Sequence, residues 1–156
     1  MNRHIIIVKP DTPQFQAVLD VAEQLDQARY VTRDYAHADA SFVLGAWLDH
    51  ACVGFLRLLI QIIGRSEGRP PIMRANQALR EGFVEAFGVL PQVRRHGIGQ
   101  ALQEYAIMQA TQSECYQVRS RSPVTSVENY ALKLKMGYAI QPSNENDSYY
   151  FIKALM

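Results

Sequence analysis

Short apolar runs and two-residue alternation mark seven segments of the chain as predicted β-strands. These segments span residues 4–10, 41–48, 51–63, 81–90, 115–122, 138–140 and 148–155. Asp49 and His50 alone separate the second segment from the third, which is hairpin length. Gly, Arg and Pro residues predict a loop over 64–71, and the stretch PIMRANQAL that overlaps its end fits no single pattern.

Apolar residues at helical spacing predict three helices. The first covers about 13–28, after an Asp11-Thr12-Pro13 sequence suited to capping. The second starts near Gly97, where the apolar residues that follow share one face, and the third covers 126–136 before Gly137. The predicted order is β-α-β-β-β-α-β-α-β-β, which indicates an α/β or α+β fold with a mixed sheet.

The composition is that of an ordinary globular protein and points to a single domain over residues 1–156. Apolar residues make up 48% and charged residues 20%, and the net charge is only +1. This balance gives no general attraction to nucleic acid or to an anionic membrane, so any anion must bind at a local site. No leader or membrane-spanning pattern is present, so we expect a cytoplasmic protein.

The residues that commonly hold metals or form disulfides show no such pattern here. Cys52 and Cys115 lie in apolar stretches and are expected to be reduced core residues. The four histidines have no metal-ligand spacing, so no metal is predicted.

The stretch VLPQVRRHGIGQAL, residues 89–102, combines adjacent arginines with bare backbone at the start of a predicted helix. The first amides of a helix lack internal partners, and its dipole places partial positive charge there. Gly97 and Gly99 admit a ligand close to the backbone, and Arg94 and Arg95 can contact phosphate oxygens. The pattern predicts a phosphate or pyrophosphate site, although solvated arginines and a simple turn would also explain it. It is neither a P-loop nor a dinucleotide fingerprint.

This stretch resembles motif A of the GNAT superfamily of acyl-CoA-dependent N-acetyltransferases, with Arg94, Gly97 and Gly99 at its fixed positions. The resemblance implies a mostly antiparallel central sheet flanked by helices, with acetyl-CoA as the co-substrate. It places the coenzyme A pyrophosphate on the turn and the pantetheine arm beside the preceding strand. The implied cofactor-binding residues are Phe87, Gly88, Val89, Arg94, Arg95, His96, Gly97, Ile98, Gly99 and Gln100.

Acetyl transfer to an amine requires the removal of a proton, and Glu85 is the leading candidate for the general base. The sequence EAFGV resembles the Glu-x-x-x-Val that precedes motif A in many small-molecule members. Strand alternation predicts that Glu85 shares a face with Phe87 and Val89. Glu81, which alternation places on the same face, is the second choice for the base. The competing interpretation is that Glu85 is solvated or pairs with an arginine.

The second family motif is degenerate in this chain. Ser126 occupies the position of the usual asparagine, and Asn129 could replace it if the helix is short, so the resemblance adds both to the implied cofactor-binding residues. Lys133 occupies the position of the usual proton-donating tyrosine, so no general acid is assigned, and Tyr130 is at most a weak substitute. Lys133 and Lys135 are expected to form a solvated face, and the alternative is that either one reaches a coenzyme A phosphate.

The acceptor pocket is expected around residues 28–38, the loop after Ile63 and the last strand, where aromatic and acidic side chains suit a cationic amine. The candidates are Tyr30, Asp34, Tyr35, Tyr149 and Tyr150. The leading interpretation is an acetyltransferase acting on a primary amine of a small molecule or peptide. A non-catalytic acyl-CoA-binding module and a domain for another phosphorylated ligand are the alternatives, and a homodimer is possible.

Overall fold

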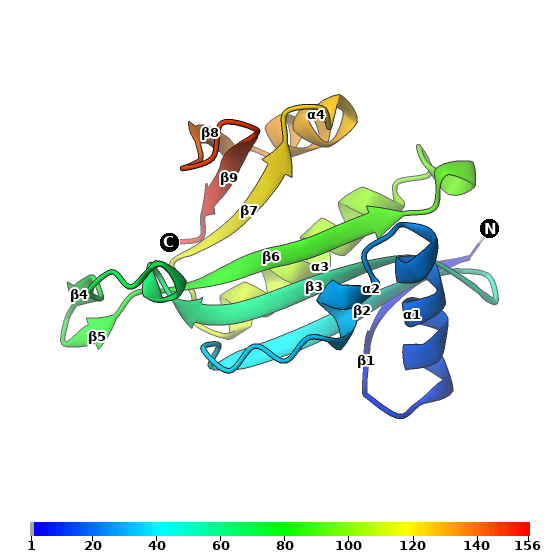
Figure 1. Cartoon of the computed structure of the whole chain (residues 1–156), viewed down its shortest axis with the longest axis horizontal. Helices are drawn as coiled ribbons and strands as arrows, with labels where there is room; N and C mark the ends of the chain where they lie inside the picture. Colours follow the sequence, from blue (N-terminus) through cyan, green and yellow to red (C-terminus); the bar gives the residue numbers. More distant parts are fainter. Residues whose placement is uncertain (1) are drawn as a thin grey trace.

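A computed structural model describes residues 2–156, which are arranged around one central sheet (Figure 1). The sheet has seven strands in the order β1-β2-β3-β6-β7-β9-β8, and only β6 and β7 run parallel. The strands are β1 (Arg3–Val8), β2 (Ala40–Leu48), β3 (Ala51–Ile62), β6 (Arg80–Val89), β7 (Gln117–Pro123), β8 (Ala139–Pro142) and β9 (Ser148–Ala154). The seven predicted strands and the mixed, mostly antiparallel sheet are confirmed.

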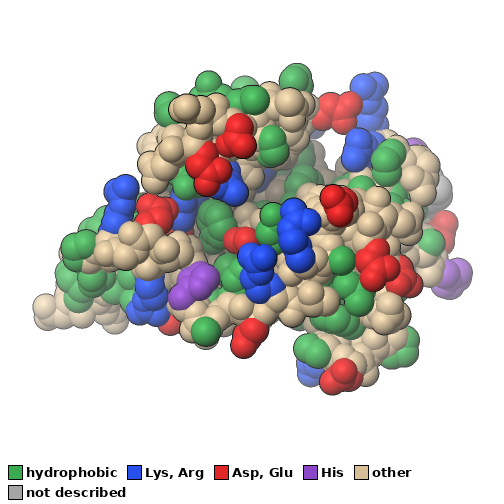
Figure 2. Space-filling view, viewed as in Figure 1, with side chains coloured by type: hydrophobic (Ala, Val, Ile, Leu, Met, Phe, Trp, Pro, Cys, Tyr) green, Lys and Arg blue, Asp and Glu red, His purple; other side chains and the backbone are tan. Residues whose placement is uncertain are grey.

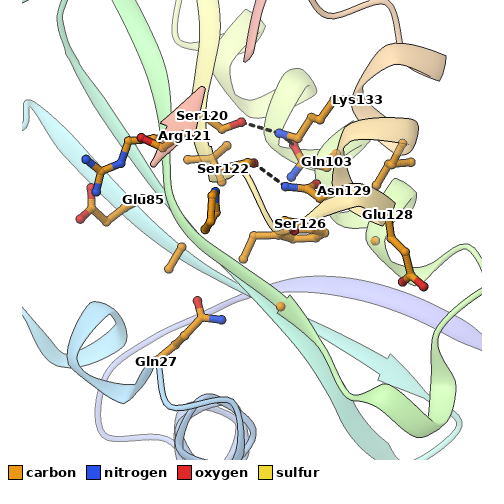
Figure 3. Close-up of a pocket in the computed structure, with 18 of the residues that line it drawn as sticks. Gln27, Glu85, Gln103, Ser120, Arg121, Ser122, Ser126, Glu128, Asn129 and Lys133 are labelled. Carbon is orange, nitrogen blue, oxygen red and sulfur yellow. Dashed lines mark hydrogen bonds between the residues drawn. The ribbon is translucent and has the colours of Figure 1, made fainter. Parts of the chain in front are cut away.

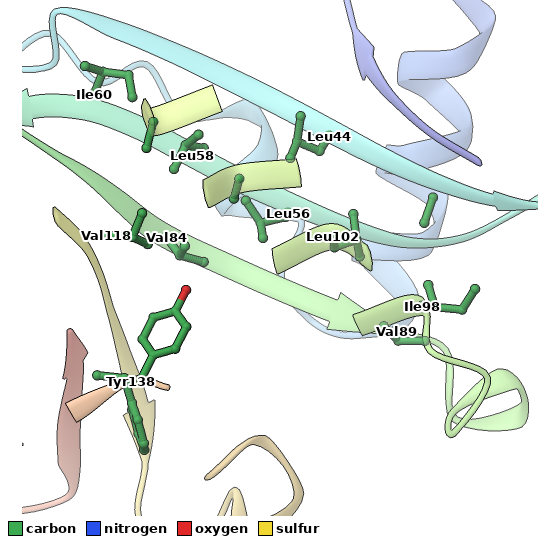
Figure 4. Close-up of a cluster of buried hydrophobic side chains, with 14 of the residues drawn as sticks. Leu44, Leu56, Leu58, Ile60, Val84, Val89, Ile98, Leu102, Val118 and Tyr138 are labelled. Carbon is green, nitrogen blue, oxygen red and sulfur yellow. The ribbon is translucent and has the colours of Figure 1, made fainter. Parts of the chain in front are cut away.

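Helices cover both faces of this sheet. They are α1 (Pro13–Gln24), α2 (Ala28–Thr32), α3 (Ile98–Gln112) and α4 (Val127–Lys135). α1 and α2 lie on one face, and α3 lies on the other (Figure 1). Leu102, Ala106 and Ala110 of α3 are fully buried against Leu56 and Leu58 of β3 (Figure 4). The sheet therefore lies between two hydrophobic layers. None of the described helices is long and apolar enough to cross a membrane.

The parallel strands β6 and β7 pair over only part of their length. Their register runs from Glu81 opposite Gln117 to Val84 opposite Ser120. Beyond these residues the two strands diverge (Figure 1). The backbone of β6 after Val84 thus has no strand partner on the β7 side.

The predicted helix over 13–28 is wrong at its C-terminal end. α1 ends at Gln24, Asp26 adopts a φ of 57°, and a separate short helix α2 follows. The buried Arg57 of β3 donates hydrogen bonds to the carbonyl oxygens of Tyr30, Val31 and Arg33. This guanidinium holds α2 against the sheet, and no local sequence pattern announces such a long-range contact.

The ambiguous stretch 71–79 contains a two-stranded hairpin, β4 (Met73–Arg74) and β5 (Gln77–Ala78). Ala75 and Asn76 at its tip have φ values of 51° and 65°. Positive φ at both central residues is the geometry of a type I′ turn. Short 3₁₀ turns also occur at η1 (Arg65–Glu67) and η2 (Pro91–Val93).

Strand β6 contains a bulge at Glu85 that changes which side chains share a face. Arg57 pairs with Ala86 and Leu58 with Val84, so Glu85 has no partner on β3. Val84 packs in the cluster under α3, whereas Ala86 packs in the cluster under α1. The prediction that Glu85 shares a face with Phe87 and Val89 is therefore wrong, because the extra residue shifts the alternation.

Replacing Leu102 tests the packing of α3 on the sheet. Leu102→Ala is expected to lower the free energy of unfolding by about 2–5 kcal/mol, because it leaves a cavity in a fully buried layer. Leu134→Ala on the exposed side of α4 is the control and should change it by less than about 0.5 kcal/mol. Urea titration of both variants measures the difference, and equal losses would contradict this packing.

Candidate active site

The divergence of β6 and β7 opens a cleft of about 1080 Å³. Its lining comes from the start of α3, both diverging strands and α4, together with residues near α2 and the loop after β3. Figure 2 shows the hollow, with acidic and basic side chains at its rim, and Figure 3 shows polar groups that line it. The cleft therefore unites most of the segments that the sequence singled out.

The glycine-containing turn forms one end of this cleft. Arg95 and Gly97 both adopt left-handed conformations, with φ values of 67° and 75°, and Gly97 caps α3 without any side-chain hydrogen bond to the helix amides. Gly97, Ile98, Gly99 and Gln100 all line the cleft. The uncapped start of a fifteen-residue helix thus faces open space, as an anion site requires.

The basic side chains of the turn have different surroundings. Arg94 donates a hydrogen bond from Nε to the Val89 carbonyl oxygen at 3.2 Å. The exposed Arg95 guanidinium lies 3.8 Å from the Glu128 carboxylate, and both residues line the cleft. His96 is exposed outside the lining, and its carbonyl oxygen accepts a hydrogen bond from Arg3. Arg94 and Arg95 line the cleft and can contact a ligand there, whereas the His96 side chain lies outside the lining.

A buried polar network lines the α4 side of the cleft (Figure 3). Asn129 donates from Nδ2 to Ser122 Oγ, which leaves its buried Oδ1 without a partner among residues 2–156. Gln103 accepts hydrogen bonds at Oε1, and its buried Nε2 is likewise unpartnered within the described chain. A buried polar atom without a partner is costly, so these two atoms indicate a ligand that supplies a donor and an acceptor.

Lys133 belongs to the same network, and the prediction of a solvated Lys133 is wrong. Its side chain is 1% exposed, and Nζ donates to Ser120 Oγ at 2.6 Å and to Gln103 Oε1 at 3.2 Å. Burial lowers the pKa of Lys133 to about 7. Lys135 is exposed, as predicted for that residue.

Glu85 lies across the gap from Lys133, on the sheet face that carries α1 and α2 (Figure 3). Burial raises the pKa of Glu85, while the Tyr35 hydroxyl and the nearby Arg33 and Arg121 guanidinium groups oppose that rise. The Tyr35 hydroxyl is buried without a hydrogen-bond partner among residues 2–156, and burial and the nearby Glu85 carboxylate raise the pKa of Tyr35. A half-buried carboxylate in this setting can accept a proton at the cleft.

The second choice of base, Glu81, is wrong because its carboxylate is fully occupied. Glu81 is completely buried and accepts two hydrogen bonds from Arg119, at 3.0 and 2.8 Å. Gln61 of β3 and Gln117 of β7 donate to the same carboxylate. Glu81 thereby ties three strands together at the closed end of the cleft and has no free oxygen lone pair directed at a substrate.

The remaining candidates divide between the cleft and the surrounding surface. Ser126 precedes α4 and lines the cleft beside Asn129, so the two candidate positions lie together. Tyr30 and Tyr150 line the acceptor side, whereas Asp34 and Tyr149 are outside the lining. Tyr130 packs against Phe151 in a tilted arrangement, with the ring centroids 5.0 Å apart. Among residues 2–156 no group of three or more metal-ligating side chains occurs.

Comparison with known proteins agrees with this geometry. A sequence model of the Acetyltransferase (GNAT) family matches residues 9–138. The chain therefore belongs to the GNAT family of acyl-CoA-dependent N-acetyltransferases, and the expected class of enzyme and of co-substrate is confirmed. No curated protein matches the sequence.

Solved structures share the fold at low sequence identity. Arabidopsis thaliana NAA60 in complex with acetyl-CoA has a TM-score of 0.76 and 12% identity, with 99% of each chain covered. The PaiA N-acetyltransferase of Thermoplasma acidophilum in complex with coenzyme A has a TM-score of 0.70 and 13% identity, with 99% of this chain and 100% of that chain covered. The IAA acetyltransferase of Bacillus cereus has a TM-score of 0.67 and 18% identity, with the same coverage. At these identities the likeness concerns the fold alone.

Replacing Glu81 tests whether it is a structural anchor. Glu81→Gln is expected to lower the free energy of unfolding by about 3–5 kcal/mol, because the buried Arg119 loses its buried counter-ion and keeps only the partly exposed Glu67 carboxylate at 3.6 Å. Glu23→Gln, on the exposed surface of α1, should change it by less than about 0.5 kcal/mol. Chemical denaturation compares the two, and a fully stable Glu81→Gln protein would overturn the structural assignment.

Proposed function

We propose that this chain, acting as a single domain, transfers the acetyl group of acetyl-CoA to a primary amine of a small molecule or peptide by direct attack. Glu85 serves as the general base. The observation that carries the proposal is the cleft between β6 and β7, which exposes an uncapped helix start at one end and Glu85 beside the gap.

The α3 side of the cleft suits the donor. The amides at the start of α3 bind the pyrophosphate, and Arg94 and Arg95 supply charge-assisted contacts. From there the pantetheine arm lies along the unpaired edge of β6 at Phe87, Gly88 and Val89, like an added strand. Its amide groups can satisfy the buried Asn129 Oδ1 and Gln103 Nε2, which otherwise lack partners within the described chain.

The opposite side of the gap suits the amine. Tyr30 and Tyr150 offer aromatic faces to a cation, and Glu85 and Glu67 offer negative charge. Glu85 takes a proton from the amine, directly or through one water, before the nitrogen attacks the thioester carbon. The raised pKa of Glu85 brings this carboxylate closer to the pH at which it must accept a proton.

Replacing Glu85 tests the base. Glu85→Gln is expected to lower kcat by about 10² to 10⁴, the usual contribution of a general base. Its affinity for acetyl-CoA should stay nearly unchanged, because Glu85 lies across the gap from the donor side. In the wild type, kcat should fall as the pH drops through the pKa of Glu85, and this acidic limb should vanish in the variant. Thiol release with an alkylamine, an aromatic amine, a free amino acid and a short peptide measures turnover.

The control for this variant is Glu23→Gln, which removes an equivalent charge from the outer surface of α1. It should retain wild-type kcat and the acidic limb. Undiminished turnover in Glu85→Gln would remove Glu85 from the role, and wild-type protein that binds acetyl-CoA but acetylates no amine would favour a non-catalytic binding module.

Replacing Asn129 tests the donor side independently. Asn129→Ala should weaken acetyl-CoA binding by about 2- to 10-fold, because one hydrogen bond to the pantetheine arm is worth about 0.5–1.5 kcal/mol. Gln112→Ala, at the exposed end of α3, should bind as the wild type does. Calorimetry with acetyl-CoA gives both values, and identical dissociation constants would exclude Asn129 from the donor site.

A further inference from the structure

The buried ammonium group of Lys133 occupies a defined position in the cleft. Its partner Ser120 is the last residue of β7 that pairs with β6, opposite Val84. Nζ therefore lies at the vertex where the two strands separate (Figure 3). A pantetheine arm that starts at the amides of α3 and follows the free edge of β6 toward Val84 would end at this vertex.

The surroundings of Lys133 offer hydrogen-bond acceptors to its ammonium group but no negative charge. Ser120 and Gln103 accept two of its three possible hydrogen bonds, and the Tyr138 ring centre lies 4.6 Å from Nζ. No carboxylate lies within ion-pair distance of Nζ among residues 2–156. Of these groups only Tyr138 titrates, and burial raises its pKa, so the phenol stays neutral. One N–H of Lys133 thus has no hydrogen-bond acceptor among residues 2–156, and Lys133 belongs to the lining of the cleft.

We propose that Lys133 is the general acid that protonates the sulfur of coenzyme A as the thioester breaks. The inference rests on the proposed function, because it requires the donor to lie along β6 with its thioester at the vertex. It assigns opposite proton transfers to opposite sides of the gap: Glu85 receives a proton on the acceptor side, and Lys133 gives one on the donor side.

The reaction then balances in protons and bonds. The ammonium form of the acceptor first loses one proton to Glu85. The neutral amine then attacks the thioester carbon and forms the C–N bond, and its nitrogen releases a second proton to solvent. The C–S bond breaks, and the electron pair that stays on sulfur accepts one proton from the Lys133 ammonium. The products are the amide and the coenzyme A thiol. After they leave the cleft, solvent restores the proton of Lys133 and removes the proton of Glu85.

The titration of Lys133 is compatible with this task. Burial lowers the pKa of Lys133 to about 7, so the ammonium gives up its proton far more readily than an exposed lysine does. A proton donor works best when its pKa lies near the operating pH. The exposed Lys135 on the same helix lacks this burial and provides a matched control.

The first experiment needs no acceptor amine. The ultraviolet absorbance of the thiolate is recorded for coenzyme A bound to the wild type, to Lys133→Met and to Lys135→Met while the pH is raised. An adjacent ammonium stabilises the thiolate, so the bound thiol should ionise at lower pH than free coenzyme A in the wild type and in Lys135→Met. In Lys133→Met, the bound thiol should ionise at the same pH as free coenzyme A. A wild-type thiol that ionises like free coenzyme A would refute the proposal without reference to any variant.

The second experiment uses the best amine of the thiol-release panel. Wild-type kcat should fall at alkaline pH as Lys133 loses its proton. Lys133→Met should lower kcat by about 10- to 100-fold, less than the upper range for acid–base groups because water can replace the acid. The alkaline limb should be lost in Lys133→Met and kept in Glu85→Gln and Lys135→Met. A purely structural lysine would leave that limb in place.

The two experiments separate the possible failures. Wild-type protein that acetylates no amine, but whose bound thiol ionises early, would refute the proposed function while supporting the placement of Lys133 at the sulfur. Normal turnover in Lys133→Met with an intact alkaline limb would refute the role of Lys133 and leave the proposed function standing.

Discussion

The site depends on the way β6 and β7 are joined at one end and free at the other. At the joined end, the buried Glu81 carboxylate accepts hydrogen bonds from Arg119 and Gln117 of β7 and from Gln61 of β3. Strand pairing stops after Val84, and the sheet splits. A central sheet normally satisfies its backbone along every strand, so this early end of the ladder leaves polar backbone open to a ligand. One buried carboxylate thus fixes the point from which the cleft opens.

The split also sorts the chemistry onto two sides. In the proposed arrangement, side chains of β6 and β7 that face α3 and α4 would contact the donor, and those on the opposite face would contact the acceptor. Because of the bulge at Glu85, its carboxylate lies on the face opposite α3, while Val84 before it and Phe87 after it lie on the α3 side. A regular strand could not place Glu85 and Ala86 together on the face opposite both of those residues. The irregularity therefore lets a continuous core under α3 coexist with a titratable group at the gap.

Much of this arrangement was predictable from the sequence, and the exceptions share a physical cause. The strands, the helix starting after Gly97 and the bare turn followed from local periodicity and glycine placement. The face of Glu85 was mispredicted because a bulge depends on the register against β3. The burial of Lys133 was mispredicted because it depends on α4 packing near Gln103 and Ser120, which lie far away in the chain. In the same way, Arg57 divides the first helical segment through contacts that span the fold.

The buried polar groups around the cleft are difficult to explain by stability alone. Within residues 2–156, the Lys133 ammonium group has no counter-ion, and the Asn129 Oδ1 and Gln103 Nε2 atoms have no hydrogen-bond partner. Each of these groups lowers the stability of the fold relative to apolar residues of similar size. Glu81 and Arg119 show that the same sheet can bury charge with full compensation when only structure is required. The uncompensated groups instead line the space that opens beyond them, whereas the compensated pair lies where the strands close. Under the proposed function, a ligand in the cleft would supply the missing partners, and the stability lost in the free protein would be regained as binding affinity in the complex.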